Sequence, residues 1–171
     1  PIRVGLLGIG TVGSGVFTVL SRNAAEIARR AGRGIELVAV ADLDVARAKS
    51  LVGEGVQVVG DAQQLIDDAS IDVVVELIGG YGIAKKLVLA AIAAGKHVVT
   101  ANKALLAVHG SEIFAAAEAK GVIVAFEASV AGGIPIIKAL REGLTANRID
   151  WVAGIINGTT NFILSEMREK G

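Results

Sequence analysis

The segment Gly8-Ile9-Gly10-Thr11-Val12-Gly13 follows directly after the apolar run at residues 2–7, and this junction decides the fold. In a dinucleotide-binding strand–turn–helix unit, the first glycine permits the tight turn and the second lets backbone N–H groups approach a pyrophosphate. The third lets helix and strand pack closely. The helix that follows directs its positive N-terminal end at the same anion. Because Gly-rich turns also serve simply to link a strand to a helix, the flanking apolar strand and long helical segment are what favour dinucleotide binding.

Strand-like and helical patterns alternate along the rest of the chain. Strands are expected at residues 2–7, 35–41, 56–59, 72–77, 97–100, 121–126 and 149–156. Helices are expected at residues 16–31, 83–94, 111–119, 136–144 and 162–170. Such alternation implies right-handed crossovers and a parallel sheet covered on both faces. The expected fold class is therefore α/β, with a Rossmann-type doubly wound parallel sheet.

The pattern changes near residues 126–131, where a sharp loop, Ala131-Gly132-Gly133-Ile134-Pro135, follows the sixth strand. We expect a dinucleotide-binding Rossmann domain over residues 1–128. Residues 129–171 are too few to form an independent core. They are expected to be the incomplete start of a second, α+β domain for substrate binding and dimerisation.

Composition excludes several classes of partner. The 17 basic and 17 acidic residues cancel, so no global field draws the protein to nucleic acid or to a membrane surface. The absence of cysteine excludes disulfides, Cys-based zinc sites and thiol nucleophiles, and it fits a cytoplasmic location. The sequence shows neither a secretion leader nor an apolar stretch long enough to span a membrane. The expected partner is a small molecule.

An acid at the end of the second strand bears on the choice of cofactor. Asp42 stands where a carboxylate accepts hydrogen bonds from the adenosine ribose, and such an acid repels a 2′-phosphate. Leu43 beside it offers no cation to bind that phosphate, so both residues favour NAD over NADP. Arg47 and Lys49 nevertheless keep NADP open as an alternative. The alternative role for Asp42 is to cap a helix or a turn.

Two more strand ends carry candidate residues. Gly79 and Gly80 close the fourth strand and would let a nicotinamide ribose come close, although a plain strand-to-helix turn has the same composition. Thr100-Ala101-Asn102-Lys103 follows the fifth strand and brings an ammonium group to the same edge. Lys103 is therefore a candidate for polarising a carbonyl or transferring a proton, the alternative being a solvated surface charge.

Together these residues resemble homoserine dehydrogenase of the bacterial type. Five segments carry the resemblance, in family order: VGLLGIGTVG at residues 4–13, VELIGG at 75–80, HVVTANKALL at 97–106, FEASVAGGIPI at 126–136 and IINGTTN at 155–161. The resemblance implies the interconversion of L-homoserine and L-aspartate 4-semialdehyde in threonine and methionine synthesis. It also implies that a hydride is exchanged between C4 of NAD or NADP and the terminal carbon of the substrate.

The resemblance also implies roles for individual residues. It implies that the pyrophosphate loop is formed by Ile9, Gly10, Thr11 and Val12, with Gly8 and Gly13 framing it. It implies that Gly79 contacts the nicotinamide side of the cofactor, and Thr100 is a further candidate for binding the cofactor. Lys103 resembles a lysine between cofactor and substrate, placed to supply the proton that reduction of an aldehyde requires.

A metal site is implied as well. Glu127, Val130, Gly132 and Ile134 fall on the family's monovalent-cation site, which is described as binding sodium. A carboxylate together with loop carbonyls suits a hard cation. The alternative is a structural loop in which Glu127 caps backbone N–H groups.

The chain departs from the family at its end. Family members continue into an acid-rich segment with substrate-binding carboxylates and a second catalytic lysine, whereas this chain ends at Gly171, so turnover by the chain is an open question. Residues 157–161 resemble the floor of the substrate region, although Thr159 and Thr160 are equally suited to capping a helix. The family also implies a homodimer or a higher homo-oligomer.

Two other readings remain open. One is another NAD(P)-dependent oxidoreductase that has the same first domain. The other is a noncatalytic dinucleotide-binding or assembly module that buries the apolar side chains of residues 151–156 between subunits.

Overall fold

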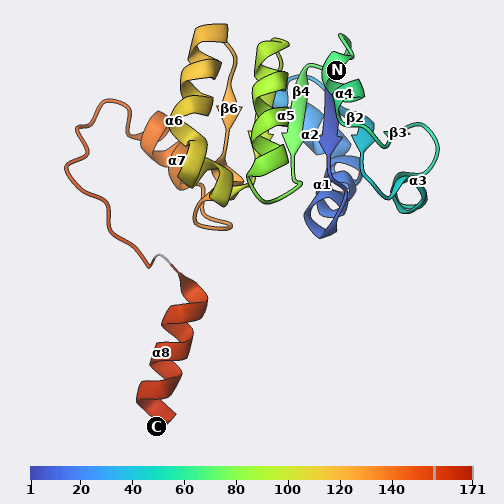
Figure 1. Cartoon of the computed structure of the whole chain (residues 1–171). Coiled ribbons are helices and arrows are strands. Elements are labelled where there is room, and N and C mark those ends of the chain that lie inside the picture. Colours follow the sequence, from blue (N-terminus) through green and yellow to red (C-terminus); the bar gives the residue numbers. More distant parts are fainter. Residues whose placement is uncertain (156, 171) are drawn as a thin grey trace.

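The fold is built on one parallel sheet. A computed structural model describes residues 1–155 and 157–170, so Ile156 and Gly171 lie outside the described residues. Six strands lie in the order β3-β2-β1-β4-β5-β6, each parallel to its neighbours (Figure 1). Their bounds are β1 Ile2–Leu7, β2 Ile35–Ala41, β3 Gln57–Val59, β4 Val73–Glu76, β5 His97–Thr100 and β6 Val124–Ala125. This order confirms the predicted Rossmann-type sheet, in which the direction of winding reverses between β1 and β4.

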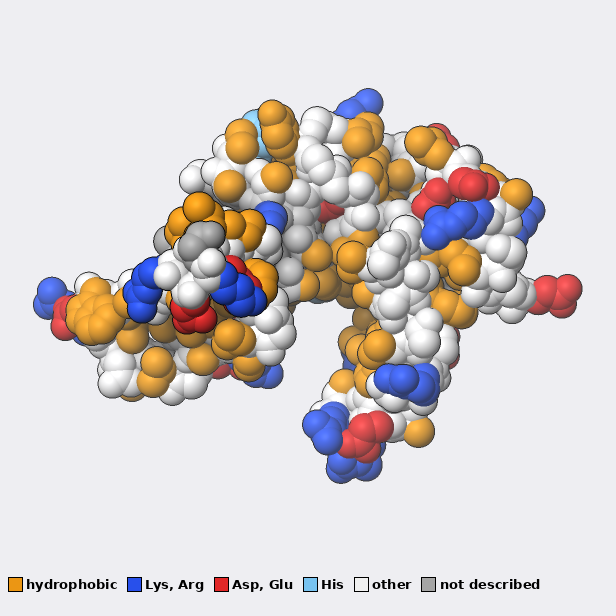
Figure 2. Space-filling view, turned by 90° about the horizontal axis from the view of Figure 1, so that it is seen from below, with side chains coloured by type: hydrophobic (Ala, Val, Ile, Leu, Met, Phe, Trp, Pro, Cys, Tyr) orange, Lys and Arg blue, Asp and Glu red, His pale blue; other side chains and the backbone are white. Residues whose placement is uncertain are grey.

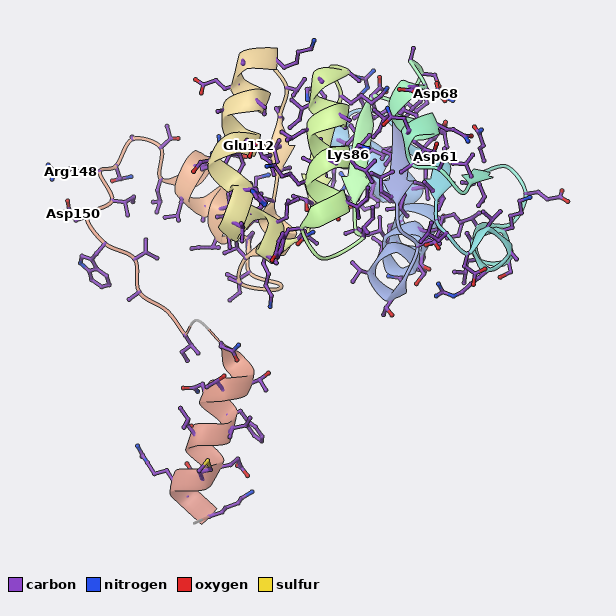
Figure 3. The ribbon with its side chains drawn as sticks, viewed as in Figure 1. Asp61, Asp68, Lys86, Glu112, Arg148 and Asp150 are labelled. Atoms are coloured by element: carbon purple, nitrogen blue, oxygen red, sulfur yellow. The ribbon has the colours of Figure 1, made fainter. Side chains whose placement is uncertain are left out.

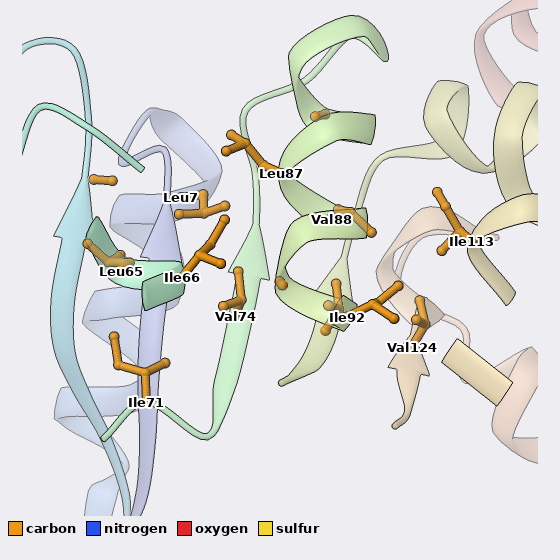
Figure 4. Packing of buried hydrophobic residues seen from close by; sticks show 14 of the residues in the cluster. Leu7, Leu65, Ile66, Ile71, Val74, Leu87, Val88, Ile92, Ile113 and Val124 are labelled. Carbon is orange, nitrogen blue, oxygen red and sulfur yellow. The ribbon is translucent and has the colours of Figure 1, made fainter. Parts of the chain in front are cut away.

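Helices cover both faces of the sheet. In chain order they are α1 Thr11–Arg22, α2 Ala24–Ala31, α3 Val45–Val52, α4 Gln63–Asp67, α5 Gly82–Ala93 and α6 Lys103–Lys120. On one face, α4, α5 and α6 enclose a buried apolar cluster that includes Val74, Ile92 and Ile113 (Figure 4). On the other face, α1 and α3 enclose a second cluster around Val40.

The central strands are apolar on both sides, as the sequence predicted. Leu6 and Leu7 are consecutive, so their side chains point to opposite faces of the sheet, yet neither is exposed to solvent. Burying a leucine contributes roughly 1.5–3 kcal/mol. The two apolar clusters therefore fix the strand register, and with it the position of the loops where the strands end.

The predicted helix at residues 16–31 is wrong in its bounds. It begins earlier, at Thr11, and is interrupted at Asn23, so that α1 and α2 are separate helices. The Asn23 N–H still donates to the carbonyl of Val19, but its own backbone leaves the helical region with φ −105° and ψ 17°. Asparagine favours such helix boundaries because its side chain competes for backbone hydrogen bonds.

The predicted strand at residues 149–156 is also wrong over its described part, because residues 149–155 have no regular secondary structure. Ile156 lies outside the described residues. Trp151, Val152 and Ile155 are 79%, 65% and 73% exposed. A strand is stable only beside another strand, and none of the described strands pairs with this segment. Apolar composition alone was therefore not sufficient to predict a strand at these residues.

The remaining C-terminal elements are short or lie apart from the sheet. The predicted helix at residues 136–144 consists of α7 Ile136–Lys138 and one wider turn, Ala139–Gly143. The final helix, α8 Gly158–Lys170, stands away from the sheet at the end of an extended segment (Figure 1). That segment carries an ion pair between Arg148 and Asp150, with Nε and Oδ1 3.1 Å apart (Figure 3).

Candidate functional site

The three glycines of the first loop meet three different needs. Gly8 has φ +89°, a left-handed conformation that favours glycine and allows the turn after β1. A Cβ on Gly13 would lie 2.3 Å from the Gly8 carbonyl oxygen, so only glycine lets α1 pass this close to the turn. A Cβ on Gly10 would meet no atom within 4 Å, and it would project into open space above the loop.

The N-terminus of α1 is available to an anion. Gly10 is its N-cap residue, and within the described part of the chain no side chain caps its N–H groups. The exposed Thr11 and Val12 form the first turn, where backbone N–H groups lack partners inside the helix. These N–H groups and the helix dipole together form the kind of site that binds phosphate groups.

A cleft of about 470 Å³ opens beside this loop. It lies at the edge where the strands end, which we call the carboxyl edge, and hydrophobic side chains are exposed on this side of the molecule (Figure 2). Its walls come from the ends of β1, β2, β3 and β4 and from the start of α5, and they are formed by Gly8, Gly10, Ala41, Asp42, Leu43, Gly60, Asp61, Ala62, Leu77, Ile78, Ile83 and Leu87. Open parallel sheets bind their ligands at this place, where the winding reverses.

Asp42 lies in the wall of the cleft and is tied to the glycine loop. Its Oδ2 accepts a hydrogen bond from the N–H of Ile9 at 2.8 Å, and its Oδ1 accepts one from the N–H of Asp44 at 2.9 Å. The turn role that the sequence left open is therefore present. Each carboxylate oxygen has a second lone pair, so a ribose hydroxyl can still donate to Asp42. Leu43, next in the chain, is 96% exposed at the mouth of the cleft.

Ile9 contributes to the loop differently from its neighbours. Its N–H is bound by Asp42 and its side chain is fully buried in the core. The guanidinium group of Arg47 lies beside the loop, with its Nη1 3.5 Å from the carbonyl oxygen of Ile9. The predicted contact between Ile9 and a pyrophosphate stays a prediction.

The end of β4 contains a buried acid to which the sequence analysis assigned no role. Glu76 is 0% exposed, and its Oε2 accepts a hydrogen bond from the hydroxyl of Thr100 at 2.7 Å. Its Oε1 accepts from the N–H of Ile78 at 2.9 Å. An acid at the end of an otherwise apolar buried strand was the available signal, because buried carboxylates require specific partners.

Lys103 is the first residue of α6 and is exposed. Asn102 caps this helix, with its Oδ1 accepting from the N–H of Leu105 at 3.0 Å. At the carboxyl edge, Gly79 follows β4, while Thr100 ends the neighbouring strand β5 and Lys103 follows it. None of these three residues lines the 470 Å³ cleft. The structure therefore places the predicted residues on one edge, in two adjacent groups.

The loop predicted to bind sodium packs against the end of β5. The Ser129 hydroxyl donates to the carbonyl of Thr100 at 2.8 Å. Both oxygens of Glu127 accept backbone N–H groups, from Ile137 and Lys138, each at 2.9 Å. This is the capping role left open by the sequence. Within residues 1–155 and 157–170, no cluster of three or more acidic or histidine side chains is suited to a metal.

The same loop offers carbonyl oxygens. Ala131 has φ +45°, and its carbonyl accepts from the N–H of Ile134 at 2.8 Å, which folds the loop back on itself. In the described part of the chain, the carbonyls of Val130 and Gly132 accept no hydrogen bond. Carbonyls with free lone pairs beside a carboxylate have the donor chemistry of a hard monovalent cation. Sodium binding here stays a prediction.

Residues 157–161 form the cap and the first turn of α8. Asn157 accepts a hydrogen bond from the N–H of Thr160 at 2.8 Å and so caps the helix itself. The side chains of Thr159 and Thr160, which the sequence also allowed as caps, are exposed. This segment lies away from the glycine loop (Figure 1).

A second cleft, of about 510 Å³, opens at the opposite edge of the sheet and contains no predicted site residue. Lys96 in its wall is 5% exposed, and its ammonium group donates to the carbonyls of Asp68 and Ile71 at 2.6 and 2.8 Å. Hydrogen bonds from the side chain and backbone of Ser70 lower the pKa of Asp68. These contacts hold the turn before β4 in place.

None of the helices in the described ranges is long and apolar enough to cross a membrane.

Comparison with known families gives two matches that together span most of the chain. Residues 8–127 match the family model described as the homoserine dehydrogenase NAD-binding domain. Residues 135–171 match the model described as homoserine dehydrogenase.

Individual relatives agree with these matches. The homoserine dehydrogenase of Pseudomonas aeruginosa is 66% identical over 100% of this chain, and that of Neisseria gonorrhoeae is 61% identical over 100% of it. Each alignment covers 39% of the relative, so the chain spans about two-fifths of the length of these relatives.

Solved structures show the same likeness. A homoserine dehydrogenase from Thiobacillus denitrificans superimposes with a TM-score of 0.92 at 65% identity, covering 99% of this chain and 39% of that one. A hyperthermophilic archaeal homoserine dehydrogenase in complex with NADPH gives a TM-score of 0.78 at 26% identity, covering 99% of this chain and 57% of that one.

Proposed function

Because the chain belongs to the homoserine dehydrogenase family, we propose that it forms the nucleotide-binding portion of an enzyme that interconverts L-homoserine and L-aspartate 4-semialdehyde. One observation carries the proposal. The cleft lies where the winding of the sheet reverses, and its floor is the glycine loop below the uncapped N-terminus of α1. This is the place and the chemistry at which a nicotinamide dinucleotide binds in such a sheet.

The residues of the carboxyl edge fit the parts of the cofactor. The first-turn N–H groups of α1 would hold the pyrophosphate, and the open space above Gly10 leaves room for it. Asp42 would accept the ribose hydroxyls on the adenosine side. Gly79 and Thr100 would lie toward the nicotinamide. The two acids of the cleft wall, Asp42 and Asp61, oppose a 2′-phosphate, so we propose NAD as the preferred cofactor and NADP as the weaker one.

Lys103 would carry the proton in the reaction. When bound, the nicotinamide ring supplies or accepts a hydride at C4. In reduction, the aldehyde carbon gains the hydride while Lys103 gives a proton to the aldehyde oxygen, which becomes the hydroxyl of homoserine. In oxidation, the lysine takes that proton back. Its exposed position at the start of α6 leaves the ammonium group free to meet a substrate.

The wider context belongs to the same proposal. The reaction serves threonine and methionine synthesis and uses the nicotinamide pool of the cytoplasm. Sodium would bind at Glu127 and the carbonyls of Val130, Gly132 and Ile134. Residues 129–171 would belong to a domain for substrate binding and homo-oligomer formation. Exposed apolar side chains such as Trp151 support this assignment, because large apolar groups at a surface favour protein contacts.

Calorimetric titration of the chain with NAD and NADP tests the proposal directly. Gly10→Ala should weaken binding by about tenfold or more, since its methyl group enters the space meant for the pyrophosphate. Gly15→Ala on the same helix is the matched control, because its Cβ also meets nothing within 4 Å, and it should bind normally. Oxidation of L-homoserine is assayed in the same preparation. Failure of the unaltered chain to bind either nucleotide would show that the proposal is wrong.

A further inference from the structure

Glu76 is the fully buried carboxylate at the end of β4, and its hydrogen-bond donors among the described residues are all uncharged. They are the hydroxyl of Thr100, the N–H groups of Ile78 and Gly79, and the side-chain amide of Asn102, at 2.7, 2.9, 3.4 and 3.5 Å. The residues before it in the strand are valines. An acid without a cationic partner is costly at such a place compared with another valine, so packing of the strand does not account for it.

The loop after β4 takes its shape from these bonds. Gly79 and Gly80 both lie in the left-handed region, with φ +82° and +63°. Oε1 of Glu76 holds the N–H groups at the start of the loop, and the side-chain amide of Asn102 donates to the carbonyl of Gly80 at its end. Two consecutive glycines have many backbone conformations available, so this one is selected by the two side chains.

The same network reaches the first turn of α6. The hydroxyl of Thr100 donates to Glu76 and accepts from the N–H of Asn102 at 3.0 Å. The Oδ1 of Asn102 in turn accepts from the N–H of Leu105, inside the helix that begins at Lys103. Glu76 and Thr100 are register partners in adjacent strands, so the sheet itself aligns the network. One run of hydrogen bonds thus joins the Gly79–Gly80 loop to the helix that carries the lysine.

We propose that Glu76 is a positioning residue that holds the Gly79–Gly80 loop against the start of α6, and so shapes the nicotinamide end of the cofactor site. This inference rests on the proposed function, because it takes the carboxyl edge to be where the dinucleotide binds. Glu76 is buried below the loop and acts through it. The adenosine and pyrophosphate end is formed by Asp42 and the glycine loop, which none of these bonds touches.

Two ligands separate this role from a general effect on folding. NADH reaches both ends of the site, whereas ADP lacks the nicotinamide and the ribose attached to it. In Glu76→Ala the dissociation constant for NADH should rise about tenfold, because the loop loses its acceptors. The dissociation constant for ADP should stay within about twofold. Glu76→Gln keeps a carbonyl acceptor and should restore most of the NADH affinity. Glu36→Gln, at an exposed acid on β2, is the matched control.

Thr100→Val supplies a second variant in case Glu76→Ala does not fold, and it should also weaken NADH selectively. Glu36→Gln is again the matched control and should bind as the unaltered chain does. Amide hydrogen exchange without nucleotide provides an independent measurement. Thr100→Val should speed exchange of the Ile78 and Leu105 N–H groups and leave that of Ile9 unchanged.

The outcomes are distinct. Equal losses for NADH and ADP, or unchanged exchange at Ile78 in Thr100→Val, would overturn the positioning role of Glu76. If the unaltered chain bound neither ligand, the proposed function would fail, and the inference would fail with it even if the exchange pattern were as expected. Selective loss of NADH binding with faster exchange at Ile78 supports both.

Discussion

Replacing Gly13 by alanine should destabilise the chain, because α1 and the turn after β1 leave no room for a methyl group. The new Cβ would lie 2.3 Å from the Gly8 carbonyl oxygen, and ordinary contact begins near 3.4 Å. The helix would therefore have to withdraw by about 1 Å. The obstacle is main chain, and the Gly8 N–H donates to the carbonyl of Ala41 at 2.9 Å. Moving the turn away from the new methyl group would therefore strain this hydrogen bond.

The size of the effect follows from two opposing contributions. Overpacking a close contact costs about 1–3 kcal/mol, and a rigid main-chain obstacle places Gly13→Ala at the upper end. Alanine is favoured over glycine within a helix by about 1 kcal/mol. The net loss should be about 2 kcal/mol, which lowers the ratio of folded to unfolded chains roughly thirtyfold. In urea, this should shift the unfolding midpoint down by about 1 M.

Gly15→Ala makes the same chemical change two residues further along α1. Its Cβ would meet no atom within 4 Å, so only the helix preference acts, and the midpoint should rise slightly. Urea unfolding followed by circular dichroism compares the two variants. If Gly13→Ala proved as stable as Gly15→Ala, the close approach of α1 to Gly8 would not exist as described, and the reasoning would be refuted.

Three further predictions concern single side chains. Leu43→Arg places a cation at the exposed mouth of the cleft, so calorimetry should show NADPH binding about tenfold more tightly with NADH little changed; equal gains for both would contradict it. Lys96→Met leaves the carbonyls of Asp68 and Ile71 without their buried donor, and urea unfolding should show a loss of about 1–3 kcal/mol. Hydrogen bonds from Ser70 keep the pKa of Asp68 below its ordinary value of 3.8, so the stability they provide is present above that pH and is lost as the pH falls through the folded-state pKa. Ser70→Ala removes the side-chain bond and keeps the backbone one, so it should lose stability relative to the unaltered chain at neutral pH. This difference should shrink as the pH falls through the folded-state pKa of Asp68, which thermal unfolding across pH measures.

The parts of the fold that sequence predicted are those that depend on local pattern. Buried strands are continuous apolar runs in the sequence, and the glycine loop identifies the junction between the first strand and the first helix. The doubly wound sheet and the position of the cleft were therefore predictable. The same reasoning failed for residues 149–155, because an apolar run forms a strand only where a partner strand lies beside it. It also missed the break at Asn23, where a single residue redirects the chain.

The site was predictable only in the same local sense. The spacing of Gly8, Gly10 and Gly13 was enough to predict their roles in the loop. The bond between Asp42 and the N–H of Ile9 joins residues 33 positions apart, and that between Glu76 and Thr100 joins residues 24 positions apart. Such pairs can be predicted only when the strand order is known, so no local pattern could assign Glu76 its distant partners Thr100 and Asn102.

The central place of β1 in the sheet has a consequence for how the chain folds. β1 is the first strand in the chain, yet it pairs with β4, and the N–H of Arg3 is bound by the side chain of Asp72, 69 positions later. During synthesis on the ribosome, β1 must therefore wait for β4 to emerge before both of its edges are covered. Chains dominated by such distant pairings have a high contact order and fold slowly, over milliseconds to seconds. Until β4 arrives, one edge of β1 presents unpaired N–H and C=O groups and is open to pairing with other chains, which favours aggregation.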